Sequence, residues 1–146
     1  MAVYTQATDA EIAQFLTGYT VGELVSAMGI TEGIENTNYL LVTEQEGRET
    51  RYILTLYEKR VRRTDLPFFL GLMEHLARQG VPCPRPLHRK DGALMAELCG
   101  RPAAMVSFLE GKGLETPNTQ HLSQLGKMAA QLHRAAEGFP LTRANA

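Results

Sequence analysis

Hydrophobic and polar residues follow a strand-like pattern in the first third of the chain. Two apolar runs, Tyr39 to Val42 and Tyr52 to Tyr57, are rich in β-branched, aromatic and aliphatic residues, and a polar stretch containing Gly47 separates them. That arrangement is typical of a β-hairpin. Glu23 to Ile30 alternates more loosely and predicts a strand before the hairpin.

Three other segments show helical spacing. Thr8 and Glu11 match a capping box at the start of a short helix. A second helix is predicted to have Thr64 as its N-cap and to end at Gly80. A third is predicted to open at Thr116 and Pro117 and to carry an apolar stripe formed by Leu122, Leu125, Ala129, Leu132 and Ala136.

The segment between the last two helices predicts the rest of the sheet. Val81 to Leu87 contains three prolines and is expected to be extended. Ala93 to Leu98 and Ala103 to Leu109 are expected to be strands, and the glycines of Gly111 to Pro117 mark a boundary. The predicted fold class is therefore α+β, a five-stranded antiparallel sheet with one packed helix. Residues 1–110 would form this unit, and residues 111–146 would be a linker and the start of a second lobe.

Composition limits the function further. The 146 residues suffice for one domain, and 15 Lys and Arg against 16 Asp and Glu give a net charge of −1, which predicts no nucleic-acid partner. No apolar run approaches the length of a membrane span, so no membrane partner is expected. Cys83, Cys99 and the four histidines show no metal-ligand spacing, so no metal site is predicted, and a reduced, cytoplasmic setting is expected.

One turn stands out as candidate chemistry. Gly33 to Asn38 combines a glycine, two asparagines and a threonine between two predicted strands. Such residues bend the chain tightly and can bring backbone N–H groups close to an anion. A plain connector between strands explains the same residues, and spacing alone leaves both readings open.

The order of elements and several motifs resemble homoserine kinase of the kinase-like type, which belongs with the aminoglycoside phosphotransferases and choline kinases. The resemblance covers essentially the whole chain. Its motifs are Gly-Ile-Glu-Asn-Thr-Asn-Tyr at 33–39, Ile-Leu-Thr-Leu-Tyr-Glu-Lys-Arg at 53–60, Asp-Leu-Pro-Phe-Phe-Leu at 65–70, Val-Pro-Cys-Pro-Arg-Pro at 81–86 and Val-Ser-Phe-Leu-Glu-Gly at 106–111.

The resemblance implies a kinase-like small lobe with part of an ATP site. The loop over the nucleotide would consist of Gly33, Ile34, Glu35, Asn36, Thr37 and Asn38. The hinge, which would offer backbone groups to adenine, would consist of Ser107, Phe108 and Leu109. Ile53, Met105 and Val106 are candidate apolar neighbours of the base, and ordinary sheet core explains them equally well.

The chain departs from the kinase pattern at one position. The strand position that usually carries a phosphate-binding lysine is occupied by Thr55. Strand alternation would put Lys59 on the same face, about 13 Å further along. Lys59 could therefore reach the nucleotide along its stem, or it could be a solvated strand end. Glu74 is a candidate partner for a cation, although a solvent-facing glutamate is the commoner case.

The catalytic base and magnesium ligands of this family come from a His-Gly-Asp motif and a later Asp, neither of which the sequence contains. The resemblance therefore implies an N-terminal portion of an enzyme that uses ATP and Mg²⁺ to phosphorylate L-homoserine in threonine biosynthesis, inactive by itself. The alternatives are another small-molecule kinase, acting on an amino alcohol, sugar or aminoglycoside, and a non-catalytic nucleotide-binding module. The stripe of the last helix predicts that the chain associates with itself through this helix or that the helix is mobile relative to the sheet.

Overall fold

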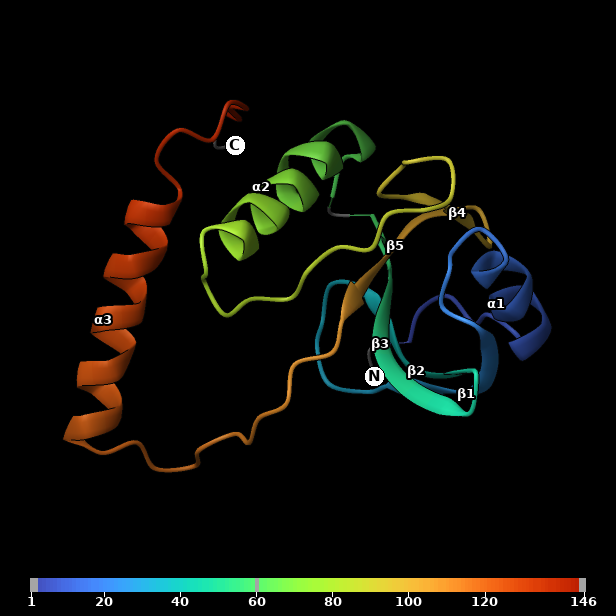
Figure 1. The fold of residues 1–146 in the computed structure, drawn as a ribbon, viewed down its shortest axis with the longest axis horizontal. Helices are drawn as coiled ribbons and strands as arrows, with labels where there is room; N and C mark the ends of the chain where they lie inside the picture. Colours follow the sequence, from blue (N-terminus) through green and yellow to red (C-terminus); the bar gives the residue numbers. More distant parts are fainter. Residues whose placement is uncertain (1–2, 60, 145–146) are drawn as a thin grey trace.

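A computed structural model of the chain describes residues 3–59 and 61–144. Its centre is one antiparallel sheet of five strands in the order β1-β2-β3-β5-β4 (Figure 1). The strands are β1 Glu23–Ile30, β2 Thr37–Gln45, β3 Arg48–Leu56, β4 Ala96–Leu98 and β5 Arg101–Ser107. The helices are α1 Asp9–Leu16, the 3₁₀ turn η1 Arg63–Asp65, α2 Leu66–Arg78 and α3 Thr119–Ala135. The predicted five-stranded α+β fold is confirmed.

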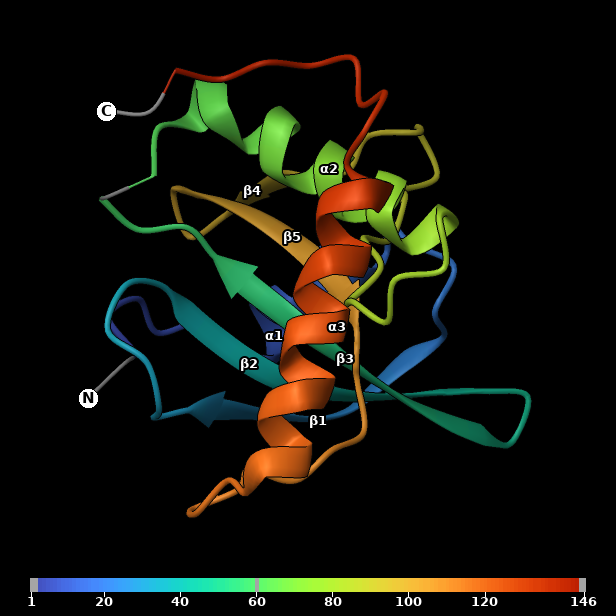
Figure 2. The ribbon, with the colours of Figure 1, turned by 90° about the vertical axis from the view of Figure 1, so that its left-hand side faces the viewer.

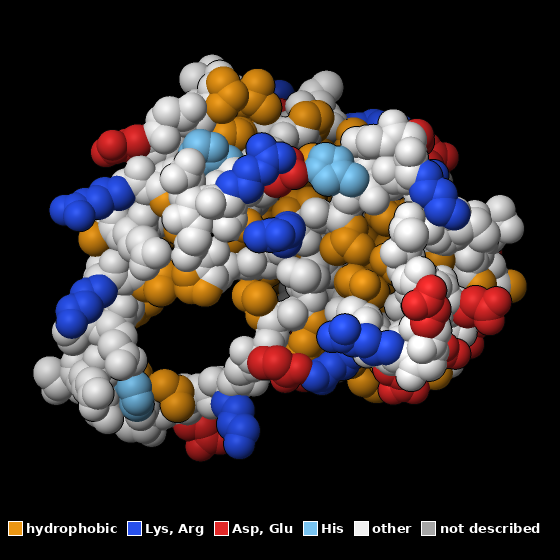
Figure 3. Space-filling model, in the orientation of Figure 1, with side chains coloured by type: hydrophobic (Ala, Val, Ile, Leu, Met, Phe, Trp, Pro, Cys, Tyr) orange, Lys and Arg blue, Asp and Glu red, His pale blue; other side chains and the backbone are white. Residues whose placement is uncertain are grey.

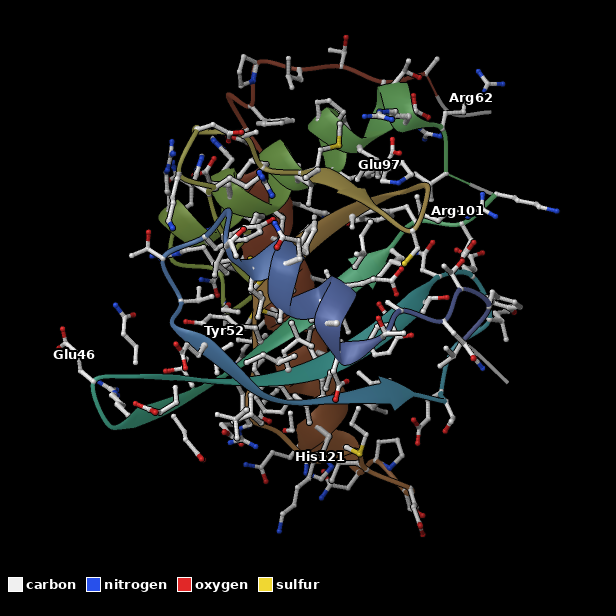
Figure 4. The ribbon with its side chains drawn as sticks, turned by 90° about the vertical axis from the view of Figure 1, so that its right-hand side faces the viewer. Glu46, Tyr52, Arg62, Glu97, Arg101 and His121 are labelled. Carbon is white, nitrogen blue, oxygen red and sulfur yellow. The ribbon has the colours of Figure 1, made fainter. Side chains whose placement is uncertain are left out.

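The strand limits differ from prediction because the turns are tight. Glu46 and Gly47 both have positive φ, 54° and 78°. A two-residue turn of this kind lets the flanking strands pair almost to its tip, so β2 and β3 reach Gln45 and Arg48. Figure 4 shows Glu46 at this tip, at the far end of the sheet from Arg101.

The last two strands are also displaced from prediction. Cys99 and Gly100, with φ of 51° and 70°, form a second tight turn, so β5 begins at Arg101 rather than Ala103. The start of the predicted strand at Ala93 is wrong, because Ala93 closes a turn by donating its N–H to Asp91 and accepting the N–H of Arg89. β4 is therefore only three residues long.

The main core lies between the sheet and α1. One set of alternating strand positions, which we call the outer face, packs against Ile12, Phe15 and Leu16 of α1. The strand residues of this core are Tyr39, Leu41, Leu54, Leu56, Leu98, Ala103 and Met105. The capping box at Thr8 and Glu11 is present as predicted, with the Glu11 N–H at 3.2 Å from Thr8 Oγ1. Figure 4 shows α1 in front of the sheet.

The other face, which we call the inner face, is turned toward α3 (Figure 2). Strand register places four aliphatic side chains in one row across this face, because directly paired residues of antiparallel strands share a face. The row runs Met28, Leu40, Ile53 and Val106. The last three of these are half-buried, and Met28 is 61% exposed.

The N-cap of the helix α2 lies one residue after the predicted one. Thr64 lies inside η1, and Asp65 is the N-cap of α2 without a side-chain hydrogen bond to the helix. The carboxylate of Asp65 pairs instead with Arg143 at 2.9 Å, which explains why it leaves the cap unfilled. Gly80 follows the helix with φ of 83°, as expected for a helix end.

The helix α3 stands apart from the sheet. Its N-cap is Asn118, not Thr116 or Pro117, because Asn118 and His121 exchange side-chain-to-backbone bonds of 3.0 and 3.2 Å. Residues 108–118 lead to it without regular structure, and Figure 3 shows an open passage between this linker, α3 and the sheet. None of the described α3 residues is buried.

The end of α3 and the following residues contact α2. Phe139 stacks edge-on against Phe68 and lies beside His75, with ring centroids 5.6 and 5.4 Å apart. The ring of His75 also lies 2.8 Å from the carbonyl oxygen of Ala135. The C-terminal end of α3 and the tail are therefore held against α2, and Leu122, Leu125 and Leu132 of the apolar stripe stay exposed.

Candidate functional site

The loop between β1 and β2 lies at the end of the sheet away from the hairpin tip. The loop covers residues 31–36, because Thr37 and Asn38 of the predicted turn are already part of β2. Gly33 has a φ of 109°, which only glycine adopts without strain. Ile34 at the tip of the loop is 77% exposed.

The predicted loop residues have different surroundings. Asn36 accepts the backbone N–H of Glu58 through Oδ1 at 3.2 Å, which joins the loop to the end of β3. Thr37 is completely buried on the outer face. Asn38 lies on the inner face and accepts a 2.7 Å hydrogen bond from the Thr55 hydroxyl. Thr37 therefore lies in the interior beneath the end of the loop. Asn38 and Thr55 form the polar end of the inner face.

The three candidate apolar neighbours of a base do not all lie on the same face of the sheet. Ile53 and Val106 are paired across β3 and β5 on the inner face. Met105 lies completely buried in the core against α1, so the expectation that it lines the site is wrong. Leu40, which the sequence analysis did not single out, pairs with Ile53 and completes the row. Strand alternation identifies Leu40 as an inner-face residue only once the register between β2 and β3 is known.

The predicted hinge is held on two sides. The N–H of Ser107 donates to the carbonyl of Arg85 at 2.9 Å, and its hydroxyl accepts the N–H of Arg85 at the same distance. On the other side, the guanidinium of Arg51 lies 4.5 Å from the centre of the Phe108 ring and pairs with Glu110. The N–H of Ser107 is thus already used, and Phe108 and Leu109 remain as the hinge positions that could offer backbone groups.

Lys59 lies beyond the regular part of β3. The strand ends at Leu56, and although the N–H of Tyr57 still donates to Pro102 at 2.8 Å, proline has no N–H to return. Strand alternation therefore does not determine on which face of the sheet the Lys59 side chain lies. Its side chain is exposed and lines a cavity of about 450 Å³ beside the loop, together with Tyr4, Thr5, Ile34, Glu58 and Arg101.

Glu74 is not the partner of Lys59 in this structure. Its carboxylate pairs with Arg78 at 2.9 Å and with Nε2 of His88 at 2.7 Å. The hydrogen bond from His88 holds the pKa of Glu74 below its usual value, and the bond to Glu74 raises the pKa of His88. Glu74 thus connects α2 to the segment before β4.

The hydroxyl of Tyr57, just beyond the end of β3, has a shifted pKa. Burial raises the pKa of the Tyr57 hydroxyl, so this group is neutral at physiological pH. The described residues contain no group of three His, Cys, Asp or Glu side chains that could hold a metal ion, and no metal is assigned a place on them. Within the same described part of the chain, no helix is long and apolar enough to span a membrane.

The sequence of the chain has counterparts among known proteins. The family model "Phosphotransferase enzyme family" matches residues 26–146. A homoserine kinase of Sinorhizobium fredii is 58% identical over all 146 residues, and one of Agrobacterium fabrum is 56% identical over the same span. The chain covers 44% of the length of each of these relatives.

One solved structure has a similar fold. A spectinomycin phosphotransferase, solved with ADP and spectinomycin, superimposes with a TM-score of 0.67 over 90% of this chain and 39% of its own. Its sequence is 18% identical, so the likeness concerns the fold alone. It confirms the kinase-like architecture expected from the order of elements.

Proposed function

Because the chain belongs to the phosphotransferase enzyme family, we propose that it forms the nucleotide-binding part of a kinase that phosphorylates the side-chain hydroxyl of L-homoserine. The observation that carries this proposal is the identity of 58% and 56% to two homoserine kinases over all 146 residues. The reaction would be a step of threonine biosynthesis. The chain spans less than half the length of these relatives, so the acceptor site is proposed for the whole protein.

The inner face fits the adenine of ATP. Leu40, Ile53 and Val106 are half-buried and form an apolar strip on which a flat base can lie. Phe108 and Leu109 follow directly after β5, beside this strip, and would supply the backbone donor and acceptor for the edge of the base. The guanidinium of Arg51, stacked on the Phe108 ring, would hold the backbone of Phe108 in position beside the base.

The phosphates would extend from this strip toward the 31–36 loop. The loop backbone around Gly33 is exposed and would offer N–H groups to phosphate oxygens. Thr55 would contribute a hydroxyl where related folds use a lysine, and Lys59 at the end of the strand would contribute the positive charge. Phosphoryl transfer depends on positioning and charge neutralisation, which these groups would begin to provide.

ATP supplies the γ-phosphoryl group, and Mg²⁺ is proposed as its companion ion in the whole protein. The 146 residues by themselves are expected to bind nucleotide without turnover, because the sequence contains no His-Gly-Asp motif to supply the base. A cytoplasmic location is part of the same proposal.

The test is a coupled assay of ADP release by the full-length protein with homoserine and choline as parallel acceptors. Turnover that depends on homoserine and exceeds that with choline supports the proposal. Equal or greater turnover with choline would assign the protein to another branch of the family. The likeness to spectinomycin phosphotransferase does not favour an aminoglycoside acceptor, because it extends only to the fold.

A further inference from the structure

Residues 3–7, which we call the N-terminal strap, cross the start of β2. The hydroxyl oxygen of Thr37 accepts the backbone N–H groups of Tyr4 and Thr5 at 2.9 and 3.1 Å. The hydroxyl of Tyr39 accepts the N–H of Ala7 at 2.9 Å and donates to the carbonyl of Thr5 at 3.1 Å. Both Thr37 and Tyr39 are buried, so the strap is attached to rigid parts of the core.

The strap also reaches the loop itself. The hydroxyl of Tyr4 donates to the backbone carbonyl of Ile34 at 2.9 Å, across 30 positions of sequence. Ile34 lies next to Gly33, the residue whose positive φ gives the loop its bend. An exposed loop of small and polar residues has little packing of its own, so this bond can decide which conformation it populates.

Glu58 connects these parts. One carboxylate oxygen accepts the hydroxyls of Thr5 and Thr37 at 2.7 and 2.8 Å, and the other lies 3.1 Å from Nε of Arg101. Its N–H donates to Asn36. The side chain of Glu58 is only 9% exposed, and its hydrogen bonds with Thr5 and Thr37 are partly buried. A single carboxylate thus joins the strap, the start of β2 and the start of β5.

We propose that the N-terminal strap, held by Glu58, fixes the 31–36 loop in the conformation that receives the phosphates of ATP. Tyr4 and Glu58 are positioning residues in this arrangement. The proposal rests on the function proposed above. A loop held in its binding conformation before the ligand arrives loses less conformational entropy on binding, and this raises affinity.

The experiment uses the full-length protein with Tyr4→Phe and Glu58→Gln. Tyr52→Phe and Glu49→Gln, both on β3 and away from the strap, are the matched controls. Hydrogen exchange of the amides of residues 31–36 is measured without nucleotide, and kcat and both KM values are measured with ATP and homoserine. Tyr4→Phe removes one hydroxyl from a side chain that is 55% exposed, so it tests the proposal even if Glu58→Gln fails to fold.

Tyr4→Phe is expected to speed exchange in the loop and to raise the KM for ATP by about threefold to tenfold, the usual effect of one hydrogen bond. The kcat and the KM for homoserine should stay within about twofold, and both controls should match the parent. Unchanged exchange in the loop would overturn the proposal. Faster exchange with an unchanged KM for ATP would overturn the role of the strap in nucleotide binding. The proposed function is judged separately, by homoserine-dependent ADP release from the unsubstituted protein.

Discussion

The hydroxyl of Thr55 donates a 2.7 Å hydrogen bond to Oδ1 of Asn38, from β3 to β2 on the inner face. Replacing Thr55 by the isosteric Val removes the donor and leaves a partly buried amide oxygen unpaired. The free energy of unfolding should fall by about 1 kcal/mol. Urea unfolding measures this change, and Thr55→Ser, which keeps the hydroxyl, should recover most of it. Equal stability of the Val and Ser variants would show that the bond contributes nothing.

Two of the described cations, Lys59 and Arg101, line the cavity beside the loop. Arg101 is already paired with Glu58. If Lys59 supplies the charge that Thr55 cannot, Lys59→Ala in the full-length protein should raise the KM for ATP or lower kcat at least tenfold, about 1.4 kcal/mol. Lys59→Arg should retain most of the activity. Lys90→Ala is the control, because Lys90 bonds to Thr17 near α1. Kinetics that do not change on loss of Lys59 would leave it as a solvated side chain.

The contact between His88 and Glu74 predicts a pH-dependent contribution to stability. Both ring nitrogens of His88 face acceptors, Glu74 at 2.7 Å and the carbonyl of Gly92 at 3.1 Å, which favours the doubly protonated ring. The raised pKa of His88 means that its contribution is present below the unfolded pKa and disappears as the pH rises through the folded value. The lowered pKa of Glu74 means that its contribution is present above the unfolded pKa and disappears as the pH falls through the folded value.

The pair should therefore stabilise the fold most between the ordinary pKa of a glutamate and that of a histidine. The destabilisation caused by His88→Ala should be larger at about pH 5.5 than at about pH 8.5. Urea unfolding at both values measures it. In a Glu74→Gln background most of this pH dependence should vanish, and its persistence there would mean that another group is responsible.

The stripe of α3 predicts self-association of the 146-residue chain. Leu122 and Leu125 are 58% and 66% exposed, and burying each leucine would contribute about 2 kcal/mol. Light scattering during size-exclusion chromatography should show the apparent mass rising with concentration. The double change Leu122→Ser and Leu125→Ser should abolish the rise, and the control Gln120→Ser with Gln124→Ser on the same helix should not. A parent chain that is monomeric at every concentration would contradict this prediction.

The sheet could be predicted from the sequence because its signals are local. Strand periodicity between Glu23 and Tyr57 and the capping box at Thr8 depend on residues a few positions apart. Several limits that were missed are set by tight turns and local caps, and two depend on tertiary contacts. The side chain of Asp65 at the N-cap of α2 pairs with Arg143, 78 residues away, and the regular pairing of β3 ends opposite Pro102.

The candidate site could be predicted only in part for the same reason. The loop and the inner-face positions of β3 follow from composition and alternation. The role of Glu58 does not, because its partners Thr5 and Thr37 lie 53 and 21 positions away and none of the three forms a local motif. Met105 and Val106 could not be told apart as core and site residues, because the sequence does not show which alternating set of β5 packs against α1.

Substitutions on the two faces of the sheet have different consequences for the protein. Along β3, Leu54 and Leu56 are enclosed by the core, and the neighbouring Ile53 and Thr55 belong to the inner face. A lineage could therefore alter what the inner face accepts, one alternate position at a time, while the residues that keep the domain folded stay as they are. Neighbouring codons in the same strand would then evolve at different rates, and each rate would report which face its residue occupies.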